Sequence, residues 1–527
     1  MTFGTLLPQN LKCRLIAKWA DWFHGEKEDV TVRRLLPLIL AFLGCSIGWA
    51  QAPTLVQHVS CPNTGELGSG IGGSMSSTPV YQCPLPEPTQ AGNAILLGLF
   101  SDNSGSPSWT VSDDKSNAWK LAGSATDSNG NIVAVYYALN VAAGTRVISV
   151  KNSGGTNGYL AVSASEYYNI ALTSALDVKS CSAGSSSKTI AAGNITPATS
   201  GDLLWQWAAD ANSASVSSFS PGSQSGITWQ LNGTDINASD ATEAGVYSST
   251  ASINPTFTSG TAEPFDSCVM ALKAASAGAA PARSFRIVHM LHAESASGNT
   301  PYAVEMPTSG NLLVISFSSG SNVISSITGT PANQWVSTGG PTNPYNQTYF
   351  PDQQMFYAAN ASTSNTLTMS IAQTGAMTGT TFMIYDVTGA AKSPFDVDSG
   401  GQMGDQATAA TQLTSCSNCL TPSAPNELIL GNVGQDWCTA TGVLSPSGAL
   451  FDSATYTGNS VNGPEPVDQN NGWFHYYDSG TSPLTATWTY VCGSYAQADW
   501  AGRLAAFKSA GLQPNAPTAL TGSVVPQ

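Results

Sequence analysis

Apolar and polar positions along this chain alternate in short blocks rather than in long helical stretches. Residues 133–137 (Val-Ala-Val-Tyr-Tyr) and 486–491 (Ala-Thr-Trp-Thr-Tyr-Val) show this alternation, which is typical of strands. The blocks are rich in β-branched and aromatic residues, and Gly, Ser, Asn, Asp or Pro bound them. No convincing helical period occurs after the first 52 residues. The pattern therefore predicts an all-β protein.

The blocks recur in the same order in two halves of the chain, which indicates an internal repeat. The separation between matching blocks lies between 216 and 235 residues and changes by loop-sized steps. Such a pattern is expected when strands are kept and loops vary. The matching blocks are 55–59 with 286–290, 92–97 with 310–315, 111–119 with 327–335, 135–140 with 355–360, 176–178 with 395–397, 202–204 with 427–429, and 271–273 with 506–508.

The length of each half predicts its architecture. Densely spaced strands in units of about 220 residues favour a two-sheet sandwich larger than an immunoglobulin domain. We therefore predict two tandem β-sandwich domains of the jelly-roll type. The predicted segments are a signal peptide at 1–52, repeat 1 at 53–275, a Gly- and Pro-containing linker at 276–283, repeat 2 at 284–508, and a tail at 509–527.

Several motifs of the first half carry a resemblance to a known fold family. They are Gly92-Asn93 before an apolar run, Val-Ser-Asp-Asp-Lys-Ser-Asn-Ala-Trp at 111–119, Val-Tyr-Tyr-Ala-Leu-Asn at 135–140, and Ala-Leu-Asp-Val at 175–178. This order resembles the concanavalin A-like or laminin-G-like jelly-roll modules that are repeated in large secreted bacterial surface proteins. Residues 514–525 look like the first strand of a fibronectin type III domain, which implies either the front of a longer modular protein or a leftover strand.

The amino terminus has the layout of a secretory signal. Arg33 and Arg34 precede an apolar run at 35–44, and Ala50-Gln51-Ala52 supplies small residues for cleavage after Ala52. The run is shorter than the roughly 20 residues of a membrane span, so we expect no membrane span after cleavage. A lipoprotein box at 43–45 and a twin-arginine signal at 31–34 are weaker alternatives. The predicted location is secreted, extracellular or at the cell surface.

Charged residues make up only 10% of the chain, and the net charge is -15. Removal of the leader, which holds six basic and four acidic residues, leaves -17. A chain this acidic has no basic field for phosphates, so nucleic acid is excluded as a partner. Neutral carbohydrate is the more compatible partner.

Eight cysteines remain after the leader, an even number that predicts disulfides in an exported chain. Metal or redox chemistry at the Cys-x-x-Cys of 416–419 is the alternative, but no second pair of that spacing completes a zinc site. Cysteines 416, 419, 438 and 492 could also exchange partners. The predicted disulfides are Cys61 with Cys83, Cys181 with Cys268, Cys416 with Cys419, and Cys438 with Cys492.

No complete catalytic motif is present in the mature chain. The one Gly-x-Ser-x-Gly lies in the leader at 44–48. A glycoside hydrolase needs two carboxylates, but Glu166 has no glutamate partner on its own strand, and its counterpart in the other half is an aspartate, Asp386, in a different context. A pair assembled from distant strands remains the enzymatic alternative.

Metal binding is also the weaker interpretation of the sequence. His58 and His289 match each other in the repeat, which indicates a structural role. His289 and His292 should point to opposite faces of a strand. A turn formed by Asp113, Asp114 and Asn117 could hold structural calcium, although a plain Asx turn is favoured. No cofactor is expected.

Aromatic residues give the better functional indication, because flat rings stack on sugars. We therefore predict a non-catalytic, exported binding or adhesion protein that recognises carbohydrate or a cell-surface polymer. A polysaccharide-active hydrolase and a purely structural spacer are the alternatives, and packing of the rings into the core is the competing explanation. The predicted ligand-binding residues are Trp473, Tyr476, Tyr477, Trp205 and Trp207.

Overall fold

The fold is built from strands joined by turns. The computed structural model describes residues 51–61, 80–101, 108–152, 160–210, 219–235, 240–275, 278–295, 302–308, 310–319, 323–341, 352–374, 380–407, 412–435, 445–446, 450–451, 456–459, 468–489 and 497–511. Within these ranges there are strands and no α-helix. The prediction of an all-β protein is confirmed, and the predicted leader and tail lie almost wholly outside the described residues.

The first half contributes fourteen of the described strands. They are β1 (Thr54–Ser60), β2 (Val80–Pro84), β3 (Ala94–Ser101), β4 (Trp109–Asp113), β5 (Trp119–Thr126), β6 (Ile132–Ala138), β7 (Val147–Asn152), β8 (Leu160–Tyr168), β9 (Leu176–Ala191), β10 (Asp202–Asp210), β11 (Phe219–Ser220), β12 (Gln230–Asp235), β13 (Asp240–Tyr247) and β14 (Thr256–Leu272).

The second half begins with the same arrangement of strands as the first half and continues with a larger number of strands, several of them short. Its strands are β15 (Arg286–Ser295), β16 (Tyr302–Thr308), β17 (Leu312–Ser319), β18 (Ile324–Thr330), β19 (Trp335–Ser337), β20 (Asp352–Ala359), β21 (Ser364–Gln373), β22 (Thr380–Thr388), β23 (Ala390–Asp398), β24 (Gln402–Ala407), β25 (Gln412–Leu420), β26 (Glu427–Gln435), β27 (Ser445–Pro446), β28 (Leu450–Phe451), β29 (Tyr456–Asn459), β30 (Asp468–Asp478), β31 (Leu484–Thr489) and β32 (Gln497–Ser509).

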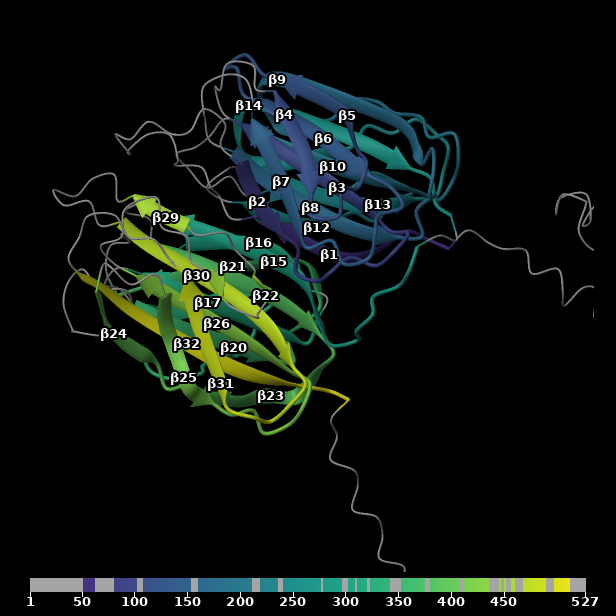
Figure 1. The fold of residues 1–527 in the computed structure, drawn as a ribbon. Coiled ribbons are helices and arrows are strands. Elements are labelled where there is room, and N and C mark those ends of the chain that lie inside the picture. The colour runs from purple at the N-terminus through teal and green to yellow at the C-terminus, as the bar shows by residue number, and fades with distance from the viewer. Residues whose placement is uncertain are drawn as a thin grey trace, which may run out of the picture. The chain divides into compact units, whose positions relative to one another are not determined.

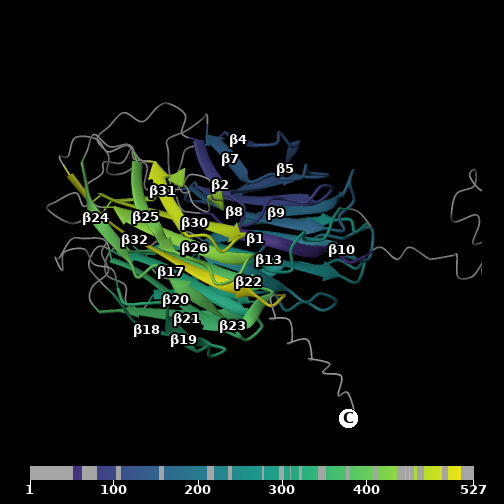
Figure 2. The same ribbon diagram turned by 60° about the horizontal axis from the view of Figure 1, so that its bottom comes forward.

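One ten-stranded sheet, the central sheet, runs through both halves in the order β19-β20-β17-β22-β15-β1-β8-β3-β6-β5. The halves meet where β1 pairs in parallel with β15, and we call this line of contact the seam. Figures 1 and 2 show the strands of the first half in purple to teal and those of the second half in teal to yellow. The strand pairing therefore departs from two separate sandwiches, because a sheet that belongs to both halves joins them.

Four further sheets cover the central sheet. In each half one is large and one is small: β11-β14-β10-β13-β12 with β9, and β2-β7-β4, in the first half; β23-β32-β26-β30-β28 with β24 and β29, and β16-β21-β18, in the second. A sixth sheet, β25-β31-β27, adjoins the large sheet of the second half.

The large sheets lie on opposite faces of the central sheet. One apolar cluster joins Leu96 of β3 to Trp205 of the first large sheet. A different cluster, on the face of Leu97, reaches Ile148 of the first small sheet and Leu428 of the second large sheet. The two halves thus place their large sheets on opposite faces of the central sheet, although β1 and β15 run parallel to each other. A twofold rotation about an axis along these strands produces this arrangement.

Strand pairing also defines which residues of the two halves correspond. The pairing of β1 with β8 skips one residue between Leu55 and Gln57, and the pairing of β15 with β22 skips one between Ile287 and His289. Gln57 therefore corresponds to His289. The sequence match of His58 with His289 is wrong by one residue, since the two histidines are neighbours across the parallel pair.

Three predicted disulfides are confirmed. Cys61 bonds to Cys83 between β1 and β2, Cys181 bonds to Cys268 across the antiparallel pair β9 and β14, and Cys416 bonds to Cys419 within β25. The predicted bridge between Cys438 and Cys492 lies outside the described residues.

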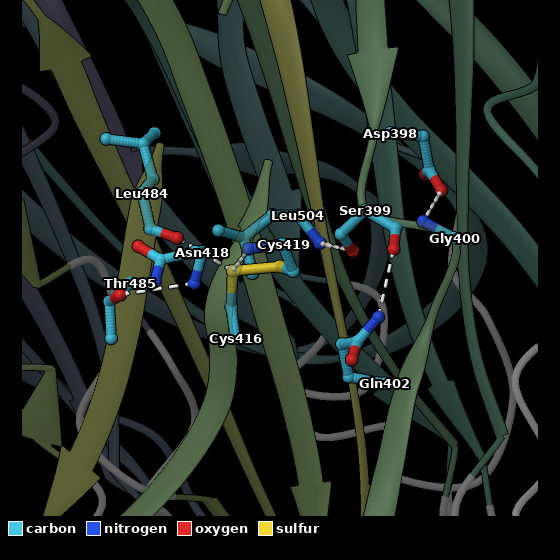
Figure 3. The surroundings of a disulfide bond; sticks show 10 residues. All are labelled: Asp398, Ser399, Gly400, Gln402, Cys416, Asn418, Cys419, Leu484, Thr485 and Leu504. Atoms are coloured by element: carbon cyan, nitrogen blue, oxygen red, sulfur yellow. Dashed lines mark hydrogen bonds between the residues drawn. A yellow bond between two sulfur atoms is a disulfide. The ribbon is translucent and has the colours of Figure 1, made fainter. Parts of the chain in front are cut away.

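The Cys416–Cys419 disulfide closes an irregularity in β25. Five residues of β25, from Cys416 to Leu420, span the length that three residues of β31, from Leu484 to Ala486, cover. Within that stretch Asn418 has a φ of 53° and its N–H donates to the hydroxyl of Thr485 (Figure 3). Cys416 is only 1% exposed and packs in an apolar cluster, surroundings in which a thiol is unreactive. The structural interpretation of this Cys-x-x-Cys is therefore the better one.

Candidate functional site

A loop from the first half crosses the seam on the face of the second large sheet. Its Glu87 accepts hydrogen bonds from the Ile287 N–H (3.3 Å) and from the Tyr477 hydroxyl. The Gln57 amide bonds to the backbone of Glu87 twice, accepting from its N–H at 2.6 Å and donating to its carbonyl at 2.8 Å. We call this loop, residues 84–92, the plug.

Glu166 of β8 lies behind the plug and is 0% exposed. Its carboxylate accepts from the Gln57 amide (2.5 Å), the Gln90 N–H (2.9 Å) and the Asn93 amide (2.7 Å). Burial raises the pKa of Glu166 and of Glu87. The hydrogen bonds from Gln57, Gln90 and Asn93 lower the pKa of Glu166 and offset part of that shift.

The structure thus places a loop carboxylate, Glu87, and a strand carboxylate, Glu166, in one hydrogen-bonded network, which is the nearest arrangement to the pair that the enzymatic alternative requires. However, Glu166 is fully buried and both of its oxygens accept hydrogen bonds from protein groups. A general acid or base must reach the proton it transfers, and this carboxylate is enclosed by protein. The pair of Glu87 and Glu166 is better explained as a structural network that holds the plug.

A cavity of about 830 Å³ lies at the seam, where the first large sheet meets β1, β15 and the end of β22. Leu55, Tyr167 and Val246 line it from the first half, and Arg286 and His289 from the second. This volume is within the range of ligand sites, which occur preferentially between domains.

His289 gives the cavity wall its hydrogen-bonding capacity. Its Nδ1 lies 2.8 Å from Oδ2 of Asp386, whose Oδ1 accepts the Gly310 N–H. Since a carboxylate only accepts, Nδ1 carries the hydrogen. The other ring nitrogen, Nε2, is buried and has no hydrogen-bond partner among the described residues. The Asp386 carboxylate thus fixes the orientation of the ring and leaves Nε2 as the ring nitrogen without a hydrogen bond among the described residues.

Arg286 supplies a positive charge to the same cavity. The side chain is half-buried, and its guanidinium donates to the carbonyls of Val56 and Arg283 at 3.4 Å each. A guanidinium has five N–H donors, so capacity remains for a ligand. Burial lowers the pKa of Arg286 from a very high value, and the nearby carboxylates of Glu87 and Glu166 act against this shift, so the group stays charged at neutral pH.

His58 lies beside this site but is enclosed. Its Nδ1 lies 2.8 Å from the Ser165 hydroxyl, and its ring centre is 6.2 Å from that of His289. Burial, together with the charge of His289, lowers the pKa of His58 well below its usual range. The predicted structural role of this histidine agrees with its 1% exposure.

The predicted sugar-stacking tryptophans lie in the core. Trp205, Trp207 and Trp473 are 0%, 1% and 0% exposed, so none of them presents a ring face to a ligand. Their assignment as ligand-binding residues is corrected, because strand aromatics here fill the space between sheets. Tyr477 is half-buried and binds Glu87 of the plug, and Tyr476 packs against an apolar cluster of the second half.

The proposed calcium turn makes its own hydrogen bonds. Asp113 accepts from the N–H groups of Lys115 and Asn117 and from the Trp119 indole, and Asp114 accepts from the Arg146 N–H. No grouping of three potential metal ligands occurs in the described ranges. The Asx-turn interpretation therefore accounts for these residues.

Buried acids give the fold a specific dependence on pH. Burial raises the pKa of Asp266 to about 8 and that of Glu305 and Glu427 to about 7, whereas it lowers the pKa of His292 to about 3. An acid with a raised pKa stabilises the fold at low pH, and this contribution is lost as the pH rises through the folded pKa. A histidine with a lowered pKa has the opposite effect: the free energy of unfolding decreases as the pH falls below about 6.5, because the histidine is protonated in the unfolded chain but not in the fold.

We expect the free energy of unfolding to increase as the pH falls from about 8.5 to about 4.5, because the three acids outweigh His292 over this range, and to decrease only below about pH 4, where the acids are protonated in the unfolded chain as well. Denaturant titrations at each pH measure this. The Asp266→Asn variant should show a shallower slope between pH 6.5 and 8.5. If the free energy of unfolding of that variant changed with pH as steeply as that of the natural chain, Asp266 would not contribute to the pH dependence.

The comparisons with protein families, curated proteins and solved structures add no relative. No family model, curated protein or solved structure matched this chain. The resemblance to concanavalin A-like or laminin-G-like modules therefore stays a prediction. No helix among the described residues is long and apolar enough to cross a membrane.

Sequence reasoning missed the residues that form the cavity, above all Arg286. The spacing of the repeat nevertheless contained an indication of the cavity. The separation of matching blocks falls from 231 residues at β1 to 218 at β3, so the second half has a shorter connection between these strands.

Proposed function

We propose that this chain is a non-catalytic, exported binding protein that holds a segment of an extracellular polymer in the seam cavity. The cavity of about 830 Å³, with Arg286 and His289 in its wall, is the observation that carries the proposal. Three disulfides and a leader of secretory type support export. Among the described residues that line the cavity there is no carboxylate, which supports binding rather than glycoside hydrolysis.

A jelly-roll core in each half is part of the same proposal. The order β1-β8-β3-β6 in one sheet and β2-β7-β4 in another, repeated as β15-β22-β17-β20 and β16-β21-β18, alternates successive strands between two sheets as a jelly roll does. Each half adds one large sheet to that core. Binding modules are commonly built on such sandwiches, although fold alone does not assign a ligand.

A substitution that fills the cavity tests the proposed site. Val246 lines the cavity and is half-buried, so the indole of Val246→Trp should occupy the ligand space. Retention on immobilised polysaccharides and on protein matrices is measured for the natural chain and the variant. We expect the natural chain to be retained on at least one matrix and the variant to lose about tenfold or more in affinity.

Met403→Trp provides the matched control. Met403 is 48% exposed on β24 and does not line the cavity, so this variant should bind as the natural chain does. Thermal unfolding shows whether both variants remain folded. Equal retention of the Val246 and Met403 variants would reject the cavity as the binding site.

A further inference from the structure

The seam is occupied on one face and open on the other. The plug fills one side, where Glu87 reaches Ile287 and Tyr477 of the second half. The twofold relation of the halves places a second, corresponding position on the opposite face of the central sheet. Residue correspondences show what lies there.

The residues that receive the plug have counterparts in the cavity wall. Ile287 corresponds to Leu55 by the matching bulges of β15 and β1. Tyr477 corresponds to Val246, since these residues pair with the matching leucines of β26 and β10. Leu55 and Val246 both line the cavity. The cavity therefore lies at the position that corresponds to the plug.

Loop length explains why this position is open. Residues 85–92 separate Pro84 from Asn93 in the first half, whereas only residues 308–310 separate Pro307 from Asn311 in the second. The second loop is shorter by five residues. Of these two corresponding loops, only the first is therefore long enough to fill the seam.

The open position retains the polar groups that hold a backbone. Gln57 bonds to both the N–H and the carbonyl of Glu87, and its counterpart is His289, whose buried Nε2 has no partner among the described residues. Arg286 adds a half-buried positive charge, which complements a carboxylate such as that of Glu87.

We propose that the seam cavity binds an acidic, proline-containing peptide segment that takes the place of the missing plug. The plug itself is the guide to its chemistry: a glutamate at 87 between prolines at 86 and 88. Proline restricts the chain to extended conformations, which lowers the entropy lost on binding. The peptide carboxylate would bind Arg286, and its backbone would bond to His289. This inference rests on the proposed function and specifies its ligand.

The test uses the full chain and a blocked peptide with the sequence of residues 84–90. Isothermal titration should show saturable binding. Replacing the peptide glutamate by glutamine should weaken binding about tenfold or more, and so should Arg286→Met in the protein. Arg283→Met is the matched control, because Arg283 is exposed and lies 4.3 Å from the centre of the Tyr477 ring, outside the cavity lining.

The outcomes separate this inference from the proposed function. Absence of peptide binding, or binding that is unchanged in both Arg286→Met and Val246→Trp, would overturn the peptide assignment. If an oligosaccharide binds instead and Val246→Trp abolishes its binding, the peptide assignment fails while the proposed cavity stands. If Val246→Trp weakens no ligand, both fail.

A second variant tests the explanation by loop length. Insertion of the sequence of residues 85–89 directly after Pro307 lengthens the second loop to that of the first. This chain should fold with an unchanged or higher melting temperature and lose peptide binding about tenfold or more. Full peptide affinity in a folded insertion variant would contradict the correspondence of plug and cavity.

Discussion

Trp207→Ala should lower the free energy of unfolding by about 3–5 kcal/mol. The side chain is 1% exposed, packs in the apolar cluster of the first half, and donates its indole N–H to the Leu99 carbonyl at 3.1 Å. Removing it leaves a large cavity between the central sheet and the first large sheet and deletes the hydrogen bond to the Leu99 carbonyl. Equilibrium denaturation followed by circular dichroism measures the change.

The same experiment shows whether the Trp207 ring packs in the core or stacks on a ligand at the surface. If Trp207 stacked on a sugar at the surface, its removal would change stability by only about 0.5 kcal/mol and would abolish binding. A small stability change would therefore contradict the structure.

Gly98 supplies a matched partner for that variant. A Cβ at Gly98 would lie 2.5 Å from the Trp207 ring, so Gly98→Ala alone should destabilise by about 1–3 kcal/mol. In the Trp207→Ala background the added methyl group has space, and the same change should cost less. The two effects should therefore be non-additive, and strict additivity would show that the ring does not lie against Gly98.

Strand positions and the repeat could be predicted from the sequence because they depend on local alternation and local turn residues. The buried blocks at β3 and β17, for example, are continuous apolar runs in both halves. Three disulfide pairs could be predicted as well, because order in the chain and division between the halves left few simple pairings.

The sharing of one sheet could not be predicted in the same way. A strand that is buried on both faces reads alike whether its neighbour belongs to the same half or the other, so nothing in β1 identifies β15 as its partner. The error of one residue at His58 has a different cause. The sequence match aligned two identical residues, His58 and His289, which are neighbours across the parallel pair, whereas the matching bulges of β1 and β15 show that Gln57 is the counterpart of His289.

The candidate site was hidden for a different reason. The predicted aromatic residues are conspicuous in the sequence, but large apolar rings gain most free energy in the core. The cavity arises from a difference in length between two corresponding loops, which becomes meaningful only when the strand correspondences are known. Arg286, the cation of the cavity wall, stands at the start of β15 with no motif around it.

Removal of the Cys181–Cys268 disulfide should have the other large effect. Replacing both cysteines by alanine should lower the free energy of unfolding by about 4–5 kcal/mol, because the bond closes a loop of 87 residues and restricts the unfolded chain. The bond also joins directly opposed residues of β9 and β14, so its loss releases one edge of the first large sheet. Equilibrium denaturation without reductant measures the change.

The other two disulfides provide graded controls within the same chain. Their sequence separations are 22 for Cys61–Cys83 and 3 for Cys416–Cys419, so the chain-entropy contribution should be about 3 and about 2 kcal/mol. The expected order of destabilisation therefore follows loop length. If the Cys416–Cys419 variant were the least stable of the three, the irregular segment of β25 would be stabilised by the bond in the folded state, and the explanation through the unfolded chain would be rejected for this protein.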